Sequence, residues 1–139
     1  MYVISSFGGA RLHIEISPLF FAIFLSFSAL AADNTVQQYP DVISVKVRHD
    51  TGVIFDFDVT VSSPYDTPQR YADAFRVTDK NGRIFGEKKL IHDHEDEQPF
   101  MRDLYGVIIP QGVRTVVVQA RDQKYGYGGG MVEVTLPGR

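Results

Sequence analysis

The 139-residue chain contains no cysteine and no tryptophan, and the first absence removes whole classes of site. Without cysteine there is no disulfide framework, no thiolate zinc site, no iron–sulfur ligation and no thiol nucleophile. Neither sign of charge is in large excess, because 14 lysines and arginines against 17 acidic residues give a net charge of only −3. Nucleic-acid-binding proteins usually carry a basic patch, so this balance argues against a nucleic-acid partner.

Long apolar runs are scarce too, and the one that stands out is Leu19–Ala31. It is shorter than the stretch of about 20 residues that a membrane-spanning helix needs. Arg11 supplies a positive charge before the run, and Ala-Leu-Ala at positions 29–31 has the small-x-small form of a cleavage site. We therefore interpret residues 1–31 as a secretory signal peptide, with an uncleaved N-terminal anchor as the alternative. The cleaved chain is expected to be exported, periplasmic or extracellular, with no membrane span in its mature form and, lacking cysteine, no lipid anchor.

The remaining chain alternates apolar and polar residues with the period of a β-strand. The clearest case is 53–61, where Val53, Phe55, Phe57, Val59 and Val61 share one face. No window shows helical periodicity over three turns. Asn-Gly at positions 81–82 predicts a tight hairpin turn. The predicted strands are 43–47, 53–61, 71–77, 83–91, 113–121 and 131–136.

Short strands with regularly spaced turn signals predict the fold class. We expect an all-β chain folded as an antiparallel immunoglobulin/fibronectin-III-like sandwich of about seven strands. Residues 32–41 are expected to form an N-terminal linker, and residues 42–139 a single domain. Pro99 is expected to end any strand that continues from Ile91, with Phe100 anchoring a loop in the core.

The densest group of chemically active side chains is the run His-Asp-His-Glu-Asp-Glu at positions 92–97. If the preceding strand continues, His92 and His94 point to the same face, about 7 Å apart. With Glu97 or Glu95 as a third ligand, they would suit a divalent transition metal such as copper or zinc. The alternative is a solvated acidic loop in which the histidines cap the core.

A second group of interest is aromatic. Tyr125 and Tyr127 flank glycines in the loop 122–130, and Tyr65 lies in the proline-containing loop 62–70. Glycines let a ligand approach the backbone, and tyrosines supply contact area, so these residues are candidates for binding a protein partner. The alternative is a plain hairpin loop whose tyrosines shield its ends.

Templates for catalysis are mostly missing, since the chain has neither a Gly-x-Ser-x-Gly elbow nor a His-Glu-x-x-His motif. The question of an enzyme stays open, with a binding module favoured. The function predicted from sequence is an exported β-sandwich binding module that holds a divalent metal. The alternative is a metal-free accessory or adhesive protein-interaction domain.

Two resemblances bear on the fold. Gly86 followed by His92-x-His94 is similar to the first half of a cupin metal motif, and Pro110-x-Gly112 is similar to part of the second half. No histidine follows Gly112, and the two halves lie too close together, so a cupin-like jelly roll is the alternative fold.

The second resemblance rests on four motifs spread over about 42–136, nearly the whole predicted mature chain. These motifs are Tyr71-Ala72-Asp73-Ala74-Phe75-x-Val77, His92-x-His94-x-x-Glu97-Gln98-Pro99-Phe100, Ile109-Pro110-x-Gly112 and Ala120-Arg121-Asp122. In this region the chain resembles a family of small exported bacterial proteins without an assigned function. The resemblance implies an immunoglobulin-like sandwich in the periplasm, no known activity, and interest in His92, His94, Glu97 and Arg102.

Overall fold

A computed structural model describes residues 36–139, which form eight β-strands. The predicted signal peptide lies outside the described residues. Within 36–139 no helix is long and apolar enough to cross a membrane. The strands are β1 (Asp41–Thr51), β2 (Ile54–Ser62), β3 (Ala72–Thr78), β4 (Ile84–Lys89), β5 (Phe100–Ile108), β6 (Thr115–Asp122), β7 (Gly126–Tyr127) and β8 (Val132–Thr135).

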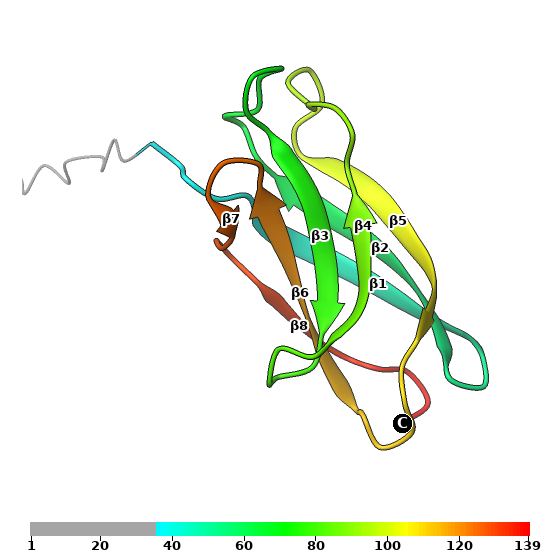
Figure 1. Cartoon of the computed structure of the whole chain (residues 1–139). Helices are drawn as coiled ribbons and strands as arrows, with labels where there is room; N and C mark the ends of the chain where they lie inside the picture. The colour runs from blue at the N-terminus through cyan, green and yellow to red at the C-terminus, as the bar shows by residue number, and fades with distance from the viewer. Residues whose placement is uncertain (1–35) are drawn as a thin grey trace, which may run out of the picture. The chain divides into compact units, whose positions relative to one another are not determined.

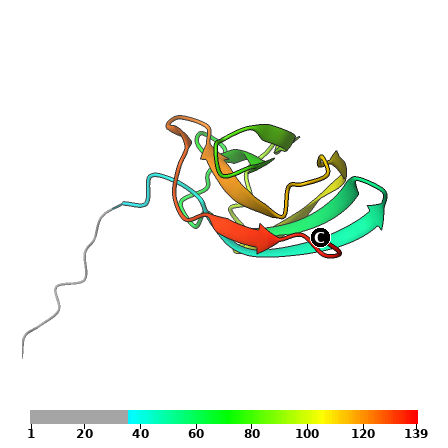
Figure 2. The same cartoon turned by 90° about the horizontal axis from the view of Figure 1, so that it is seen from below.

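The strands form two antiparallel sheets, which Figures 1 and 2 show as two layers. The first sheet has three strands in the order β1-β2-β5. The second has five, in the order β4-β3-β6-β7, with β8 also paired to β6. The predicted all-β chain with antiparallel sheets is confirmed at this level.

The core lies between the two sheets and follows the alternation in the sequence. In β2 the inward residues Phe55, Phe57, Val59 and Val61 are all 0% exposed. The central strands β3 and β6 of the second sheet face them. The core residues of these two strands are Ala72, Phe75, Val77, Val116, Val118 and Ala120. Burial of this apolar set on alternate positions holds the layers together.

Strand β5 corrects the sequence prediction, which expected a loop around Phe100. The residues after Pro99 instead start a strand that pairs with β2 over its length. Alternation is weak in this strand because it lies at a sheet edge, half exposed, and contains an irregularity opposite β2. Gly106 has a φ of 70° there, and its N–H donates to Asp56 Oδ1 at 2.9 Å.

The β2–β3, β4–β5 and β6–β8 connections meet at one end of the sandwich, which we call the loop end (Figure 1). The segment before β1 joins them and lies against the glycines of the β6–β8 connection. A Cβ at Gly128 would overlap the ring of Tyr39, and one at Gly129 would overlap the carbonyl oxygen of Pro40. These glycines therefore let the chain approach itself, and no ligand is needed to explain them.

Candidate functional site

The two histidines of the predicted metal site lie on a loop and not on a strand, because β4 ends at Lys89. The His94 ring is buried and stacks on Phe100 with 3.8 Å between ring centroids. The His92 ring is exposed, and its centroid lies 5.0 Å from that of His94. The structure thus brings the histidines together, with very different exposure.

Neither ring nitrogen of His94 has a hydrogen-bond partner within the described residues. Burial, followed by the positive charges of Arg102 and His92, lowers the pKa of His94, so the neutral ring is favoured. Buried polar atoms without partners are uncommon in folded proteins. The His94 ring is therefore either a packing element or a group that awaits a ligand.

The carboxylates predicted to complete the metal site are not positioned as ligands. Glu97 pairs with Arg102 at 3.0 Å, and this hydrogen bond lowers the pKa of Glu97. Glu95 is exposed on the same loop. Among residues 36–139 no three histidine, aspartate or glutamate side chains gather closely enough to hold a metal ion.

Two of the three predicted partner-binding tyrosines meet at the loop end. The guanidinium carbon of Arg70 lies 4.2 Å from the ring centroid of Tyr65 and 4.9 Å from that of Tyr125. Arg70 also pairs with Asp122 at 3.1 Å, and the Tyr65 hydroxyl donates to Asp122 at 2.7 Å. Burial, followed by this hydrogen bond, raises the pKa of Tyr65. The polar groups of this cluster are largely committed to one another.

Tyr127 lies elsewhere, on the outer face of the five-stranded sheet. Its hydroxyl donates to Glu87 Oε2 at 2.6 Å, and the Arg76 guanidinium lies 3.8 Å from its ring centroid. Burial and the hydrogen bond to Glu87 raise the pKa of Tyr127. Tyr127 therefore links β7 to β4 across the outer face of the sheet.

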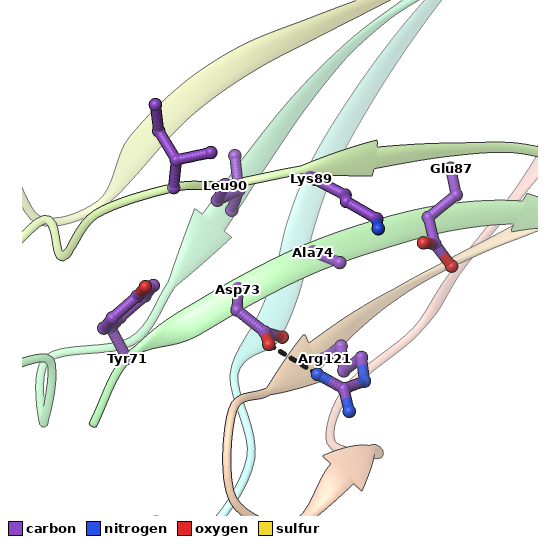
Figure 3. Close-up of a pocket in the computed structure, with 8 residues that line it drawn as sticks. Tyr71, Asp73, Ala74, Glu87, Lys89, Leu90 and Arg121 are labelled. Carbon is purple, nitrogen blue, oxygen red and sulfur yellow. Dashed lines mark hydrogen bonds and ion pairs between the residues drawn. The ribbon is translucent and has the colours of Figure 1, made fainter. Parts of the chain in front are cut away.

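Beside Tyr127 this outer face contains a hollow of about 520 Å³, which we call the β3–β4 hollow (Figure 3). Strand register creates it, because Ala74 pairs with Lys89 on one side and with Arg121 on the other. A small floor is thus flanked by two long cationic side chains. The lining residues are Tyr71, Asp73, Ala74, Glu87, Lys89, Leu90, Ile91 and Arg121.

Several polar groups of the β3–β4 hollow have unused hydrogen-bonding capacity. One carboxylate oxygen of Asp73 pairs with Arg121, whereas Oδ1 has no partner within the described residues. The Lys89 side chain points across Ala74 into the hollow, and it makes no ion pair within residues 36–139 (Figure 3). Glu87 uses one oxygen to accept from Tyr127. The hollow therefore presents both donors and acceptors to a ligand.

Sequence reasoning did not single out this hollow. Its polar residues lie at outward positions of strands and look like an ordinary solvated face. A signal was nevertheless present, because Tyr71, Asp73, Ala74 and Arg121 belong to two of the motifs that carry the family resemblance. The structure places those distant motifs side by side on β3 and β6.

A smaller hollow of about 280 Å³ lies on the other side of the β4 end and reaches the histidines. It shares Lys89, Leu90 and Ile91 with the β3–β4 hollow. Its remaining lining residues are Lys88, His92, His94 and Arg102. The histidine pair and the larger hollow are thus neighbours on either side of the segment 89–91, where β4 ends.

Comparison with known proteins gives one similar sequence. Over 107 residues the chain is 34% identical to a protein of Halomicrobium mukohataei named "Putative lipoprotein". The match covers 73% of this chain and 52% of the relative, so the chain spans about half the length of the relative it matches. No family model and no solved structure matches the chain. The chain is therefore similar to a protein whose name assigns no activity.

Proposed function

We propose that the protein is an exported binding module of the cell envelope, with its ligand site in the β3–β4 hollow. The name of the relative supports a cell-envelope location, as does the signal-like segment at 1–31. The chain has no cysteine, so the proposal carries over the location and not a lipid attachment.

The proposal includes an immunoglobulin/fibronectin-III-like arrangement of the sandwich. Strands β1, β2 and β5 take the places of strands A, B and E in such a fold. Strands β4, β3, β6 and β8 take those of C′, C, F and G. Pairing of sequence neighbours, β1 with β2 and β3 with β4, supports this order over a jelly roll.

The observation that carries the binding site is the unused hydrogen-bonding capacity around Ala74. A buried donor or acceptor without a partner costs about 1–3 kcal/mol. Asp73 Oδ1 is such an atom. It has almost no exposed surface as it stands, but the Asp73 side chain as a whole is 21% exposed and shares the hollow with the unpaired Lys89, so a small rotation would present it to a ligand.

The test uses protein expressed from the full chain and amide NMR spectra. Probes are glucose, glycine, succinate and 1,4-diaminobutane, each added separately. At least one probe is expected to shift the amides of Asp73, Ala74 and Lys89. Ala74→Leu, which forces apart the side chains that cover the floor of the hollow, should abolish those shifts. Thr60→Leu, at an outward position of β2, is the matched control and should retain them. Silence from every probe, or binding unchanged in Ala74→Leu, would refute the proposal.

A second candidate function is the metal site at His92 and His94. The 5.0 Å separation of the rings suits two imidazoles bound to one ion at about 2.0–2.1 Å. His92 Nδ1 lies 2.9 Å from the carbonyl oxygen of Asp93, a contact that leaves Nε2 for a metal. Glu97 would have to leave Arg102, or Glu95 would have to turn inward, to supply a third ligand.

Metal content separates this candidate from a packing role. Untagged protein is expected to bind about one equivalent of zinc or copper if the candidate holds. The double variant His92→Ala/His94→Ala should lose the metal. His49→Ala is the matched control, because His49 contacts the carbonyl oxygen of Gly52 in the β1–β2 turn. Wild-type protein that takes up neither metal would assign the pair to the scaffold.

The tyrosine-based partner surface receives less support. Tyr65 donates its hydroxyl to a buried carboxylate, and Arg70 between the rings is paired. Tyr125 retains 41% of its exposure and is the member of the set most available to a protein partner. Tyr127 faces a different surface.

A further inference from the structure

We infer that the β3–β4 hollow is a saccharide subsite that receives one or two neutral sugar units. This inference rests on the proposed function, because it names the ligand class of the same site. Three features of the lining carry it: the balance of charge, the shape of the floor and the apolar wall at one end.

The charged groups of the lining are balanced. Two carboxylates, Asp73 and Glu87, face two cations, Lys89 and Arg121. A ligand with one net charge would meet repulsion from one of these pairs. Hydroxyl groups both donate and accept, so a polyhydroxylated ligand can satisfy the lysine ammonium and the free carboxylate oxygens together.

The bottom of the hollow is narrow and covered. Ala74 lies in the row between Lys89 and Arg121, on strands spaced about 4.8 Å apart. It is only 3% exposed, because the side chains on both sides of it cover the methyl group (Figure 3). A ligand therefore rests on the Lys89, Arg121 and Asp73 side chains above this row. A ring held there has polar groups along its edge, where a sugar carries its hydroxyls.

The wall at the loop end of the hollow is apolar. It consists of Tyr71, Leu90 and Ile91, and Ile91 is 85% exposed. Leu90 is 7% exposed, so Tyr71 and Ile91 supply the accessible surface of this wall, and the apolar face of a ligand would cover them. The ring of Tyr71 can pack against the C–H face of a sugar while its hydroxyl stays in water. Succinate, diamines and glycine offer little apolar surface for this wall.

The size of the hollow fits the same class of ligand. Small-molecule pockets span roughly 300–1,000 Å³. The hollow, at about 520 Å³, lies in the lower half of that range and is open to solvent. A sugar unit bound here can remain part of a longer glycan, as a module of the cell envelope would require.

The experiment is an NMR titration of protein expressed from the full chain. The saccharide probes are glucose, galactose, mannose, N-acetylglucosamine and the disaccharides maltose and cellobiose. The comparison probes are succinate, 1,4-diaminobutane and glycine. At least one saccharide is expected to shift the amides of the hollow, and to bind more tightly than every comparison probe.

Variants locate the interaction. Lys89→Met and Asp73→Asn should each weaken saccharide binding about tenfold, because each removes a charge-assisted hydrogen bond. Lys46→Met, on the outward face of β1, is the matched control and should bind as the wild type does. Tyr71→Ala should lose most of the affinity, whereas Tyr71→Phe keeps the ring and should stay within about twofold. Dispersed amide spectra confirm that each variant is folded.

The outcomes separate the two proposals. Saccharide binding that Lys89→Met weakens and Lys46→Met leaves intact supports both. If a comparison probe shifts the hollow amides and no saccharide does, the saccharide inference is wrong and the binding function stands. If no probe shifts them, both are wrong. Equal loss in Tyr71→Phe and Tyr71→Ala would overturn the assignment of the aromatic wall.

Discussion

Two regions of the molecule use their carboxylates in opposite ways. At the loop end the side chain of Asp66 is 0% exposed, and it accepts the backbone N–H groups of Ala72 at 3.0 Å and His94 at 3.1 Å. In the β3–β4 hollow Asp73 faces outward, and one of its oxygens has no partner within the described residues. The inward carboxylate is committed to the fold of its own chain. The outward carboxylate retains capacity for a ligand.

Asp122 extends the contrast at the loop end. It is 0% exposed and accepts from the Tyr65 hydroxyl, the Arg70 guanidinium and the backbone N–H groups of Lys124 and Tyr125. Together Asp66 and Asp122 fix three connections against one another. The loop end is thus closed by internal hydrogen bonds, although in antibody variable domains comparable loops form the binding surface. Binding is therefore expected on the sheet face and not on these loops.

The largest expected effect is on stability at the loop end. Asp66→Ala leaves two backbone N–H groups without acceptors and should lower the free energy of unfolding by about 2–4 kcal/mol. The measurement is equilibrium unfolding in urea. Asp73→Ala, in the hollow, is the matched control and should cost less than about 1 kcal/mol, because its ion pair with Arg121 is partly exposed. Similar losses in both variants would remove the distinction between the regions.

The pH dependence of stability should separate the two buried aspartates. Burial raises the pKa of Asp66 because its hydrogen bonds do not fully offset that cost. Burial also acts on Asp122, but hydrogen bonds from Tyr65, the backbone and Arg70 outweigh it and lower the pKa. Asp122 therefore stabilises the fold fully above the unfolded value of about 3.9, and this contribution is lost as the pH falls through its lower folded pKa.

Asp66 behaves in the opposite sense. The stability linked to its raised pKa is complete below about 3.9 and is lost as the pH rises through its folded pKa. Unfolding of the wild type, Asp66→Asn and Asp122→Asn between pH 2.5 and 6 provides the check. The differences between the wild type and each variant should change with pH in opposite directions. Parallel curves would show that both aspartates are stabilised in the same way.

The all-β chain with antiparallel sheets could be predicted because alternation in a half-buried strand directly reflects which side is buried. In β2 the inward positions Phe55, Phe57 and Val59 matched the pattern. Strand β5 could not be seen in the same way, because it is half exposed and its irregularity at Gly106 shifts the period. An edge strand that is buried only near its two ends, at Phe100 and Val107, looks locally like a loop.

The sites were harder to predict because they depend on partners far apart in the sequence. The histidine run was visible because His92 and His94 are sequence neighbours. The end of β4 at Lys89, however, put them on a loop and left Glu97 with Arg102. The β3–β4 hollow exists only because register aligns residues of three strands around Ala74. Outward polar residues alone do not indicate such an alignment.

A smaller effect is expected at His94, which lies on the β4–β5 connection at the loop end. Replacing the ring with phenylalanine keeps the stack on Phe100 and removes two buried nitrogens that have no partner. His94→Phe should leave the free energy of unfolding unchanged or raise it by about 1 kcal/mol. His92→Phe, at an exposed position, is the control for adding an aromatic ring. A loss above about 1 kcal/mol in His94→Phe alone would show that a nitrogen of His94 is satisfied in solution.

The smallest effect on stability, and the sharpest test of the comparison, is expected at Lys89. Its side chain is exposed, lies on an edge strand and makes no ion pair within residues 36–139. Lys89→Met should therefore change the free energy of unfolding by no more than about 0.5 kcal/mol. Lys88→Met is the matched control, because the neighbouring Nζ lies 3.8 Å from Asp103 and faces the other sheet.

Stability and binding must both be measured on the same Lys89→Met protein, because only the two results together separate a binding residue from a structural one. A binding residue can be lost without cost to the fold, since its partner is the ligand. A structural residue cannot, since its partner is the chain. Unfolding in urea close to that of the wild type, together with weakened ligand binding, would identify Lys89 as a binding residue. A loss of unfolding free energy as large as that of Asp66→Ala would identify it as a structural residue. The polar groups of the β3–β4 hollow would then serve the fold, as those of the loop end do.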